Sequence, residues 1–417
     1  MFREEPAILL DSKIISVEQK IWRVTLFGPD NFKAALISQY LHSKKKNLRA
    51  PAIKYAQDLL KEYFDESISQ KAAEQALQQL IKFPEEVHYP KHPVTTFTFI
   101  DLFAGIGGFR YAMQRLQGEC VFTSEWDKMA QQTYYANFGE IPFGDITKEE
   151  TKKWIPNKFD VLCGGFPCQP FSLAGVVKKN SLGRKHGFED EKQGNLFFHV
   201  AEIIEKHRPK AFFLENVKNL VSHDKGNTFK VIKTTLENLG YSFEWKVIDG
   251  KNYVPQHRER TFMVGFDKNK VKNYKNFVFP ILPEKRLYNL SYVLEKRVDK
   301  KYTLSDKLWS YLQAYAKKHQ EKGNGFGFGL IDPQNKKATT RTISARYYKD
   351  GAEILIAQKN RNPRRLTPYE CSLLQGYPTD FLIPVSDNQA YKQFGNSVVV
   401  PLIEAIGERI IEVLDKS

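Results

Sequence analysis

The sequence predicts an α/β protein with a parallel sheet, preceded by a helical segment and interrupted by a small irregular domain. Short apolar runs alternate with helical segments between residues 94 and 275, which is typical of a parallel sheet covered by helices. Apolar residues recur at helical spacing before residue 84, and beyond about residue 276 the alternation gives way to a segment rich in Lys, Arg, Tyr and Gly. We therefore predict a helical N-terminal accessory domain over 1–83, an α/β domain over 94–275 that is completed by 385–417, and an irregular domain over 276–384.

The N-terminal domain contains three stretches with helical periodicity. One follows Asn31, a second carries apolar residues from Ile53 to Phe64, and a third follows Ser69. A basic cluster at 44–49 lies between the first two, and it either contacts phosphates or forms a solvated loop. Three prolines between residues 84 and 93 indicate a linker to the next domain.

The α/β domain opens with a strand, a glycine-rich turn and a helix. The strand Phe97–Phe103 precedes Gly105-Ile106-Gly107-Gly108, and a helix is expected over 109–116. The next strand, Cys120–Ser124, ends at Glu125, which lies 20 residues after Gly105. An acidic residue at that place grips ribose hydroxyls in dinucleotide-binding folds, so the turn indicates a nucleotide-like cofactor. The turn does not match G-x-G-x-x-G, and a nicotinamide enzyme or a plain tight turn stays open at this point.

A stiff loop follows the third strand of this domain. The strand Asp160–Cys163 runs into two glycines, and prolines at 167 and 170 flank Cys168. Neither a strand nor a helix continues through such a segment, which places the cysteine at the end of a strand. A thiol there is positioned to act as a nucleophile, although free cysteine is also among the most buried residue types.

A fourth strand brings an acidic residue toward the same edge of the sheet. Helices are expected over 196–206, 228–239 and 399–414, and the strand Ala211–Leu214 ends at Glu215. Because parallel strands end at one edge, Cys168 and Glu215 are expected to face one pocket. A thiolate beside a carboxylic acid can attack an electron-poor ring and protonate it as charge develops. The plain alternatives are a capping carboxylate for Glu215 and a surface arginine for Arg260 downstream.

The composition indicates a polyanionic partner. The chain has 417 residues and a formal net charge of +15, which favours nucleic acid, with a generally basic protein as the alternative. Four cysteines without C-x-x-C spacing predict free thiols in a reducing cytosol and no metal site. Residues 1–10 lack a long apolar core and no run approaches the ~18 apolar residues of a membrane helix, so we expect neither a signal peptide nor a membrane partner.

The order of these segments resembles the bacterial DNA (cytosine-5)-methyltransferases, over about residues 94–412. The resemblance rests on five segments: Phe99–Gly108, Gly165–Ser172, Glu215-Asn216-Val217, Gln256–Arg260 and Gly395–Val398. It implies a Rossmann-like methyltransferase domain that uses S-adenosylmethionine, releases S-adenosylhomocysteine, and carries a small target-recognition domain. The positions that match the family's cofactor site are Phe103, Gly105, Ile106, Gly108, Glu125, Trp126, Asp145, Ile146, Leu196, Asn396 and Val398.

The same resemblance implies a catalytic group and a set of DNA contacts. Cys168 matches the nucleophile, and Glu215 and Arg260, with Arg258 beside them, match the residues that hold a cytosine flipped out of the duplex. The loop 172–193 could close over DNA, or it could be an ordinary charged surface loop. Arginines of the small domain are expected to read guanine edges, with a phosphate contact or a solvated charge as the alternative for each. The expected DNA-contacting residues are Phe166, Pro167, Gln169, Ser172, Lys178, Arg184, Arg341, Thr342, Ile343, Arg346 and Lys349.

Residues 323–356 resemble the recognition region of the EcoRII/Dcm branch. That resemblance implies methylation of the inner cytosine of CCWGG, with CCNGG or CCGG as alternative sites. It also implies a restriction-modification or orphan methylase that acts as a monomer on double-stranded DNA in the bacterial cytoplasm, associated with the nucleoid, and a cognate endonuclease could share its site. An RNA cytosine methyltransferase, and an additional regulatory role of the N-terminal domain in transcription, stay open.

Overall fold

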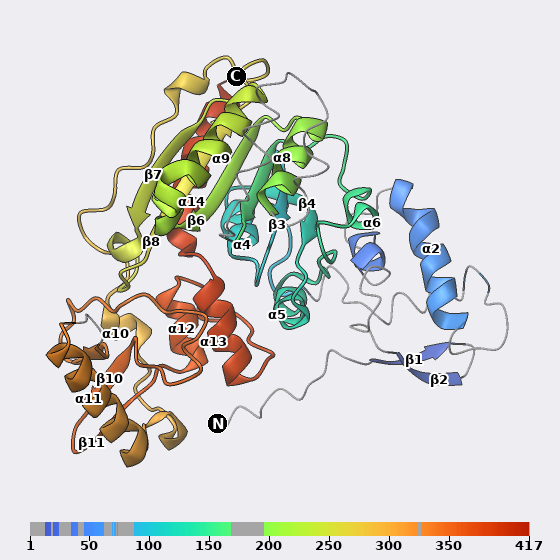
Figure 1. The fold of residues 1–417 in the computed structure, drawn as a ribbon. Helices are drawn as coiled ribbons and strands as arrows, with labels where there is room; N and C mark the ends of the chain where they lie inside the picture. The colour runs from blue at the N-terminus through green and yellow to red at the C-terminus, as the bar shows by residue number, and fades with distance from the viewer. Residues whose placement is uncertain are drawn as a thin grey trace. The chain divides into compact units, whose positions relative to one another are not determined.

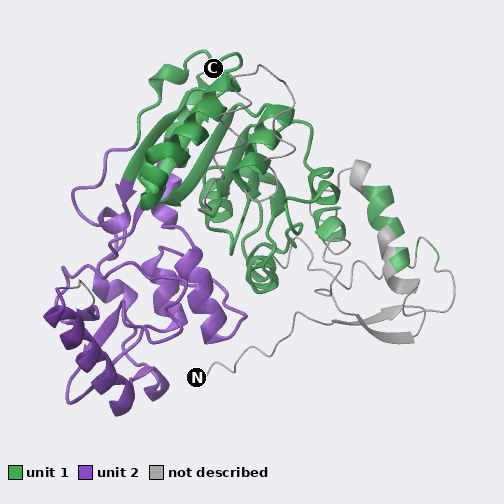
Figure 2. Cartoon of the chain, viewed as in Figure 1, with its two compact units in different colours: residues 1–247, 260–279, 407–417 green, residues 248–259, 280–406 purple. Residues whose placement is uncertain are grey.

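The computed structural model describes residues 13–17, 20–24, 35–40, 46–61, 69, 71, 73, 87–167, 196–323 and 327–416. Its contacts divide the chain into two compact units (Figure 2). The first unit contains residues 1–247, 260–279 and 407–417, and the second contains residues 248–259 and 280–406. No helix in the described part of the chain is long and apolar enough to cross a membrane.

A six-stranded sheet forms the centre of the first unit (Figure 1). The strand order is β4-β3-β5-β6-β8-β7. Its strands are β3 (Phe97–Leu102), β4 (Gly118–Ser124), β5 (Val161–Gly165), β6 (Ala211–Val217), β7 (Glu244–Asp249) and β8 (Glu259–Phe266). The pairs β3–β4, β3–β5 and β5–β6 are parallel, which confirms the predicted α/β class.

The sheet is not parallel throughout, because β8 runs antiparallel to β6. Sequence analysis did not predict β7 or β8. The connection between them spans only residues 250–258, which is shorter than the dozen or more residues that a parallel crossover needs. The sheet is therefore mixed at the side that carries Arg260.

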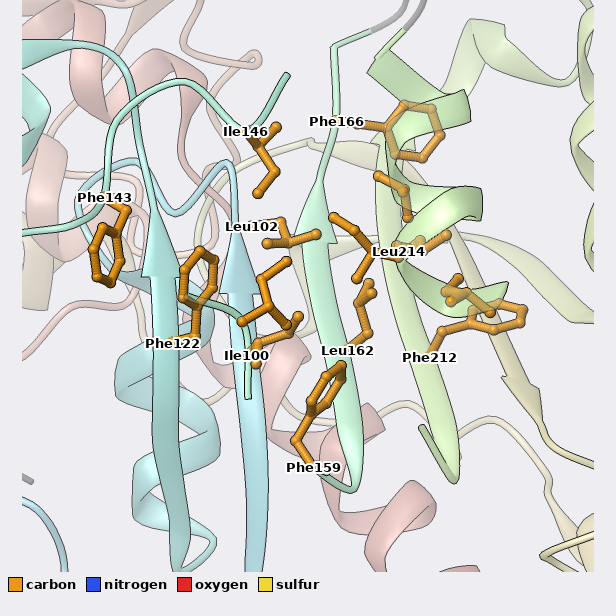
Figure 3. Close-up of a cluster of buried hydrophobic side chains, with 14 of the residues drawn as sticks. Ile100, Leu102, Phe122, Phe143, Ile146, Phe159, Leu162, Phe166, Phe212 and Leu214 are labelled. Atoms are coloured by element: carbon orange, nitrogen blue, oxygen red, sulfur yellow. The ribbon is translucent and has the colours of Figure 1, made fainter. Parts of the chain in front are cut away.

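One face of the sheet packs into a large apolar core (Figure 3). Alternate residues of the strands point into it, as the pleat of a strand requires, and Ile100, Leu102 and Leu162 are fully buried there. Helices α8 (Leu196–His207) and α9 (Asn227–Asn238) cover this face with their apolar stripes. Both helices and the strands β3, β4, β5 and β6 were predicted from the sequence to within a few residues.

The opposite face of the sheet packs against α4 (Gly108–Arg115) and the C-terminal part of α14 (Val400–Asp415). The Phe109 ring meets the Phe213 ring edge-on with centroids 5.0 Å apart. A Cβ at Gly407 would come within 2.8 Å of Leu116, so α14 approaches the end of α4 closely. The remaining helical elements of the first unit are α2 (Lys46–Lys61), α5 (Lys128–Phe138), α6 (Glu149–Lys152), η2 (Lys218–Leu220), η3 (His223–Gly226) and η5 (Tyr274–Asn276).

The N-terminal segment contains a hairpin and helices. Strands β1 (Lys13–Val17) and β2 (Lys20–Val24) pair antiparallel, and sequence analysis did not predict them. Residues 35–40 are helical, and Leu36 and Ile37 are buried in the same core cluster as the central sheet. These contacts group residues before 84 with the first unit, whereas their predicted status as a separate accessory domain stays a prediction.

The second unit has a small sheet and several helices. Strands β9 (Leu330–Ile331), β10 (Leu355–Gln358) and β11 (Arg361–Arg364) follow the order β11-β10-β9. Residues 385–406, which were predicted to complete the α/β domain, group with this unit, and the predicted boundaries stay predictions. Its helical elements are η4 (Gly250–Asn252), α10 (Leu290–Val293), η6 (Lys300–Tyr302), α11 (Asp306–Glu321), α12 (Pro368–Leu374) and α13 (Asp387–Asn396).

Candidate active site

The turn between β3 and α4 has an unusual backbone. Phe103, Gly105 and Gly107 all have positive φ, at 55°, 56° and 87°. Gly107 must be glycine, because a Cβ there would lie 2.2 Å from the Phe138 ring. A non-glycine residue with positive φ is uncommon and is often found at functional sites, so Phe103 marks this turn as a candidate site.

Glu125 ties this turn to the end of β4. Its two carboxylate oxygens accept hydrogen bonds from the backbone N–H groups of Gly105 and Asp127, each at 2.8 Å. The side chain is largely buried, and this burial raises the pKa of the carboxyl above its ordinary value even though the two N–H groups favour the charged form. Each oxygen keeps a further acceptor position, so the carboxylate can also bind hydroxyl groups.

The segment that carries Asp145 lies beside the end of β4. Phe143 forms an isolated parallel bridge with Ser124, and its ring stacks on Phe122 with centroids 5.1 Å apart. Asp145 is half-buried, and its Oδ1 accepts a hydrogen bond from the Thr147 N–H at 2.9 Å. Ile146 points into the apolar core, where Figure 3 shows it near Leu102. Glu125 and Asp145 therefore belong to neighbouring strand ends.

These residues fit a nucleoside-type cofactor. A Cβ at Gly105 would meet no atom within 4 Å, so the turn leaves open space beside the Glu125 carboxylate. Trp126 is 78% exposed and offers an aromatic surface next to that carboxylate in sequence. Ile106 and Gly108 are buried at the start of α4, and Leu196 is the half-buried first residue of α8.

A charged pair stands at the end of β6. The Arg260 Nε lies 3.0 Å from Oε1 of Glu215, and both side chains are mostly buried. Glu215 is in register with Gly165 of β5, where a Cβ would come within 3.3 Å of Oε2. Glycine at 165 therefore leaves room for the carboxylate. The structure therefore brings Glu215 and Arg260 together, while their predicted role in holding the cytosine stays a prediction.

The loop after β5 is fastened to the same strand end. Asn216 is buried, and its Nδ2 donates a hydrogen bond to the Phe166 carbonyl at 2.8 Å. The Phe166 ring is buried against Phe197, with centroids 5.8 Å apart, while Pro167 is exposed. Five of the predicted site residues lie outside the described residues: Cys168, Gln169, Ser172, Lys178 and Arg184.

The three cysteines in the described part of the chain are unsuited to nucleophilic chemistry. Cys120, Cys163 and Cys371 are free and buried. Burial raises the pKa of Cys120 to about 12 and the pKa values of Cys163 and Cys371 well above the ordinary range. Since the thiolate is the reactive form, these three residues are inert.

The second unit holds the other predicted site residues. Arg258 is 2% exposed, and its guanidinium donates to backbone carbonyls rather than facing an open surface. Asn396 ends α13 with an exposed side chain, and Val398 follows it in a buried position. The cofactor-binding role predicted for Asn396 and Val398 stays a prediction.

The predicted DNA-reading residues of this unit differ in exposure. The side chains of Arg341, Arg346 and Lys349 are exposed, and the Arg341 guanidinium donates a hydrogen bond to the Gly327 carbonyl. Ile343 is fully buried, and its backbone N–H and carbonyl are hydrogen-bonded to Gln256 and Arg258. Thr342 is half-buried, and its hydroxyl donates to the carbonyl of His257.

Sequence analysis missed two polar residues that shape these sites. Asn216 fixes the Phe166 carbonyl, and Gln256 accepts the Ile343 N–H at Oε1 over 2.9 Å. Both lie inside segments that carried the resemblance, next to residues that were singled out. The signal that could have identified them was an amide side chain beside the predicted site residues. A buried amide needs partners for its donors and its acceptor, so it indicates hydrogen bonds to nearby backbone.

Comparison with known proteins identifies the family of the chain. The family model for C-5 cytosine-specific DNA methylase matches residues 97–412. The chain is 48% identical over 388 residues to the type II methyltransferase M.SsoII of Shigella sonnei, covering 91% of this chain and 99% of that protein. It is also 48% identical over 369 residues to a DNA-cytosine methyltransferase of Escherichia coli K12, covering 76% of this chain and 78% of that one.

The fold is also that of a solved methyltransferase. The structure of Dnmt2 from S. pombe aligns with a TM-score of 0.58 at 15% identity, over 77% of this chain and the whole of that one. Such low identity supports the fold alone, whereas the family model and the two relatives support the activity. The chain belongs to the C-5 cytosine-specific DNA methylase family and is a DNA cytosine-5 methyltransferase of the type II restriction-modification kind.

Proposed function

We propose that this enzyme methylates carbon 5 of the inner cytosine of CCWGG in duplex DNA, with S-adenosylmethionine as methyl donor and a covalent adduct to Cys168. It acts as the modification enzyme of a restriction-modification system or as an orphan methylase. The site preference rests on the resemblance of residues 323–356 to the EcoRII/Dcm branch. The chemistry rests on the residues at the ends of β5 and β6.

The Glu215–Arg260 pair is the observation that supports this chemistry most directly. Its 3.0 Å contact lies at the end of β6, beside the β5 strand end from which the chain continues to Cys168. Asn216 fixes the Phe166 carbonyl, two residues before Cys168 in the chain. The other three cysteines are buried with raised pKa values, which leaves Cys168 as the candidate nucleophile.

Glu125 and Asp145 are the residues that would hold the cofactor's nucleoside. Glu125 offers carboxylate oxygens to ribose hydroxyls, and Asp145 offers its acidic side chain to the adenine amino group. When bound, S-adenosylmethionine supplies an electrophilic methyl group from its sulfonium sulfur. The open space at Gly105 and the exposed Trp126 ring support this assignment.

Cys168 and Glu215 then perform the steps that make the cytosine ring nucleophilic. The Cys168 thiolate forms a bond to carbon 6, and the displaced ring electrons make carbon 5 able to accept the methyl group. Glu215 holds a proton at N3 and so stabilises the charge that develops there, while Arg260 orients the Glu215 carboxyl. A base removes the proton from carbon 5, the electron pair restores the double bond, and the thiolate leaves.

The target base must leave the duplex for these steps. Carbon 6 of a stacked cytosine is inaccessible to a side chain, so the nucleotide flips into the site at the cost of its stacking and pairing. The exposed side chains of Arg341, Arg346 and Lys349 are the candidates for base and phosphate contacts on the surrounding DNA.

Bisulfite sequencing tests the proposal in one experiment. The protein is expressed in a host without cytosine methylation, beside Cys168→Ala as the control, and genomic DNA and tRNA are both sequenced. We expect protected cytosines at the inner position of CCWGG in DNA, and none with Cys168→Ala. Protection at CCNGG or CCGG would correct the site, protection in tRNA alone would overturn the DNA substrate, and full activity of Cys168→Ala would overturn the covalent mechanism.

A further inference from the structure

Arg258 binds two separate segments of the second unit from a buried position. The side chain is 2% exposed. Its Nη1 donates to the Ile343 carbonyl at 3.0 Å, and its Nη2 donates to the Gly395 carbonyl at 2.9 Å and to the Ser397 carbonyl at 2.5 Å. A planar guanidinium with several fixed donors can hold two segments at once, which a lysine ammonium on a flexible stem cannot reproduce.

The two bridged segments also touch each other directly. A Cβ at Gly395 would lie 2.3 Å from the Ser344 carbonyl and 2.4 Å from the Ala345 nitrogen. Only a residue without a side chain permits this approach, since real Cβ atoms do not come so close to backbone. The segment 342–345 and the segment 395–397 therefore pack backbone to backbone.

The backbone that carries Arg258 is itself held firmly. Asp249 Oδ1 accepts the Arg258 N–H at 3.0 Å, and the Gly250 N–H donates to the Arg258 carbonyl at 3.0 Å. Gln256, two residues earlier, accepts the Ile343 N–H and donates to the Leu374 carbonyl at 3.1 Å. Arg258 therefore bridges the two segments from a backbone that is itself hydrogen-bonded.

We propose that Arg258 is a positioning residue that couples DNA binding to cofactor binding by holding Thr342–Ile343 and Gly395–Ser397 as one body. This inference rests on the proposed function and on the sequence-based assignment of Thr342 and Ile343 to the DNA site and of Asn396 and Val398 to the cofactor site. Because its guanidinium donates to backbone carbonyls, Arg258 would act through these segments and not by touching substrate or cofactor. Its effect is the extra affinity for one ligand when the other is bound, which is a reciprocal coupling between the two sites.

The test measures that coupling as a ratio of dissociation constants. A fluorescent DNA duplex is titrated with the enzyme, with and without saturating S-adenosylhomocysteine. The duplex carries the recognition sequence that bisulfite sequencing has identified. Coupling between sites typically spans a factor of about 5 to 150. We expect the wild-type ratio to lie in that range, and we expect Arg258→Lys to bring it close to one while each ligand alone binds within about threefold of wild type.

Two further variants separate coupling from general loss of structure. Arg364 is another buried arginine of the same unit, and its guanidinium pairs with Glu370 at 2.7 Å outside the proposed sites. Arg364→Lys removes this pairing, so it should lower the melting temperature while the ratio of dissociation constants stays at the wild-type value. Gly395→Ala should reduce the ratio as Arg258→Lys does, because it forces the same two segments apart. An unchanged ratio in Arg258→Lys, an equal loss in Arg364→Lys, or a wild-type ratio of one in an enzyme that methylates DNA would each overturn the inference while leaving the proposed function standing.

Discussion

Asp101 is a buried carboxylic acid at the centre of the sheet. It is fully buried on β3, in register with Cys163 on β5. Burial raises the pKa of its carboxyl to about 8, although the nearby charge and backbone N–H of Arg110 lower it in part. In the folded protein the group is therefore neutral through much of the physiological range, whereas in the unfolded chain it ionises near its ordinary value of about 3.9.

This difference predicts that Asp101 makes the protein less stable as pH rises. Because the pKa of its carboxyl is raised in the folded state, the contribution of Asp101 to the free energy of unfolding is fully present below about pH 4. This contribution is lost progressively as pH approaches 8. In urea unfolding at pH 5, 6.5 and 8, Asp101→Asn should therefore gain free energy of unfolding relative to wild type as pH increases. A difference that stays constant over that interval would contradict the neutral buried state.

Asp160 gives the matched control for this experiment. Its partial burial is outweighed by hydrogen bonds from Thr98 and by its ion pair with Lys210 at 2.9 Å, which together lower its pKa. A lowered folded pKa gives stability that is lost only as pH falls below the ordinary range for aspartate. Asp160→Asn should therefore cost the same free energy at pH 5 and at pH 8.

Single residues were read from the sequence with uneven success for a physical reason. Glu215 was placed at a strand end by its apolar run, whereas Arg260 was assigned to the same site only by the family resemblance, because its strand β8 was not predicted. Arg258 matches the same motif and has the same chemistry, but its partners are carbonyls at residues 343, 395 and 397, far away in the chain. The identity of a residue does not reveal which distant backbone it will meet.

At the scale of elements, strength of local pattern explains part of what was predictable, although the buried strand β8 was missed despite its apolar run. Strands β3, β5 and β6 are buried on both faces and appear as continuous apolar runs, so they were found. Strand β7 lies at the edge of the sheet, its first three residues are exposed and it lacks such a run, so it was missed. Helix α5 is capped by Asp127 but has its polar residues buried along with its apolar ones, which hides the amphipathic period.

Helix α4 is held to the loop after α5 by a buried ion pair. The Arg110 guanidinium donates to both Glu140 oxygens at 3.0 and 2.8 Å, and both side chains are more than nine-tenths buried. Gln39 adds a hydrogen bond to Glu140 at 3.1 Å. The pair therefore joins the glycine-rich turn of α4 to the loop that leads to Asp145.

Removing one partner of this pair should be costly. Glu140→Gln leaves the Arg110 charge buried without its carboxylate, and such a change typically costs about 3–5 kcal/mol. Glu119→Gln is the surface control. The Glu119 Oε1 lies 3.7 Å from the Nζ of Lys91, whose side chain is 56% exposed, and such surface pairs contribute about 0–1 kcal/mol. Urea unfolding of both variants measures the difference, and equal costs would show that the buried pair contributes no more than the surface one.

At the scale of the whole molecule, the segment before residue 84 is built into the first unit. Leu36 and Ile37 are buried in the core cluster of the central sheet. The Ser38 hydroxyl accepts the Ile141 N–H at 2.9 Å, on the loop that continues to Asp145 and Ile146. A regulatory role of this segment in transcription stays a prediction, but its contacts already give it a part in the stability of the methyltransferase core.

Deletion of residues 1–83 should therefore destabilise the enzyme and weaken cofactor binding, because it exposes the core beside the loop that carries Asp145. The loss of stability should exceed that caused by Leu36→Ala, a substitution that creates a cavity in the core and costs about 2–5 kcal/mol.

Deletion of residues 1–34 is the control, because it keeps the helical segment 35–40 and should retain most of the stability. Thermal melts with and without S-adenosylhomocysteine measure both effects, since a ligand that binds only the folded state raises the melting temperature. If the enzyme without residues 1–83 had the melting temperature and the S-adenosylhomocysteine affinity of the full chain, residues 35–40 would not be needed for the stability of the core.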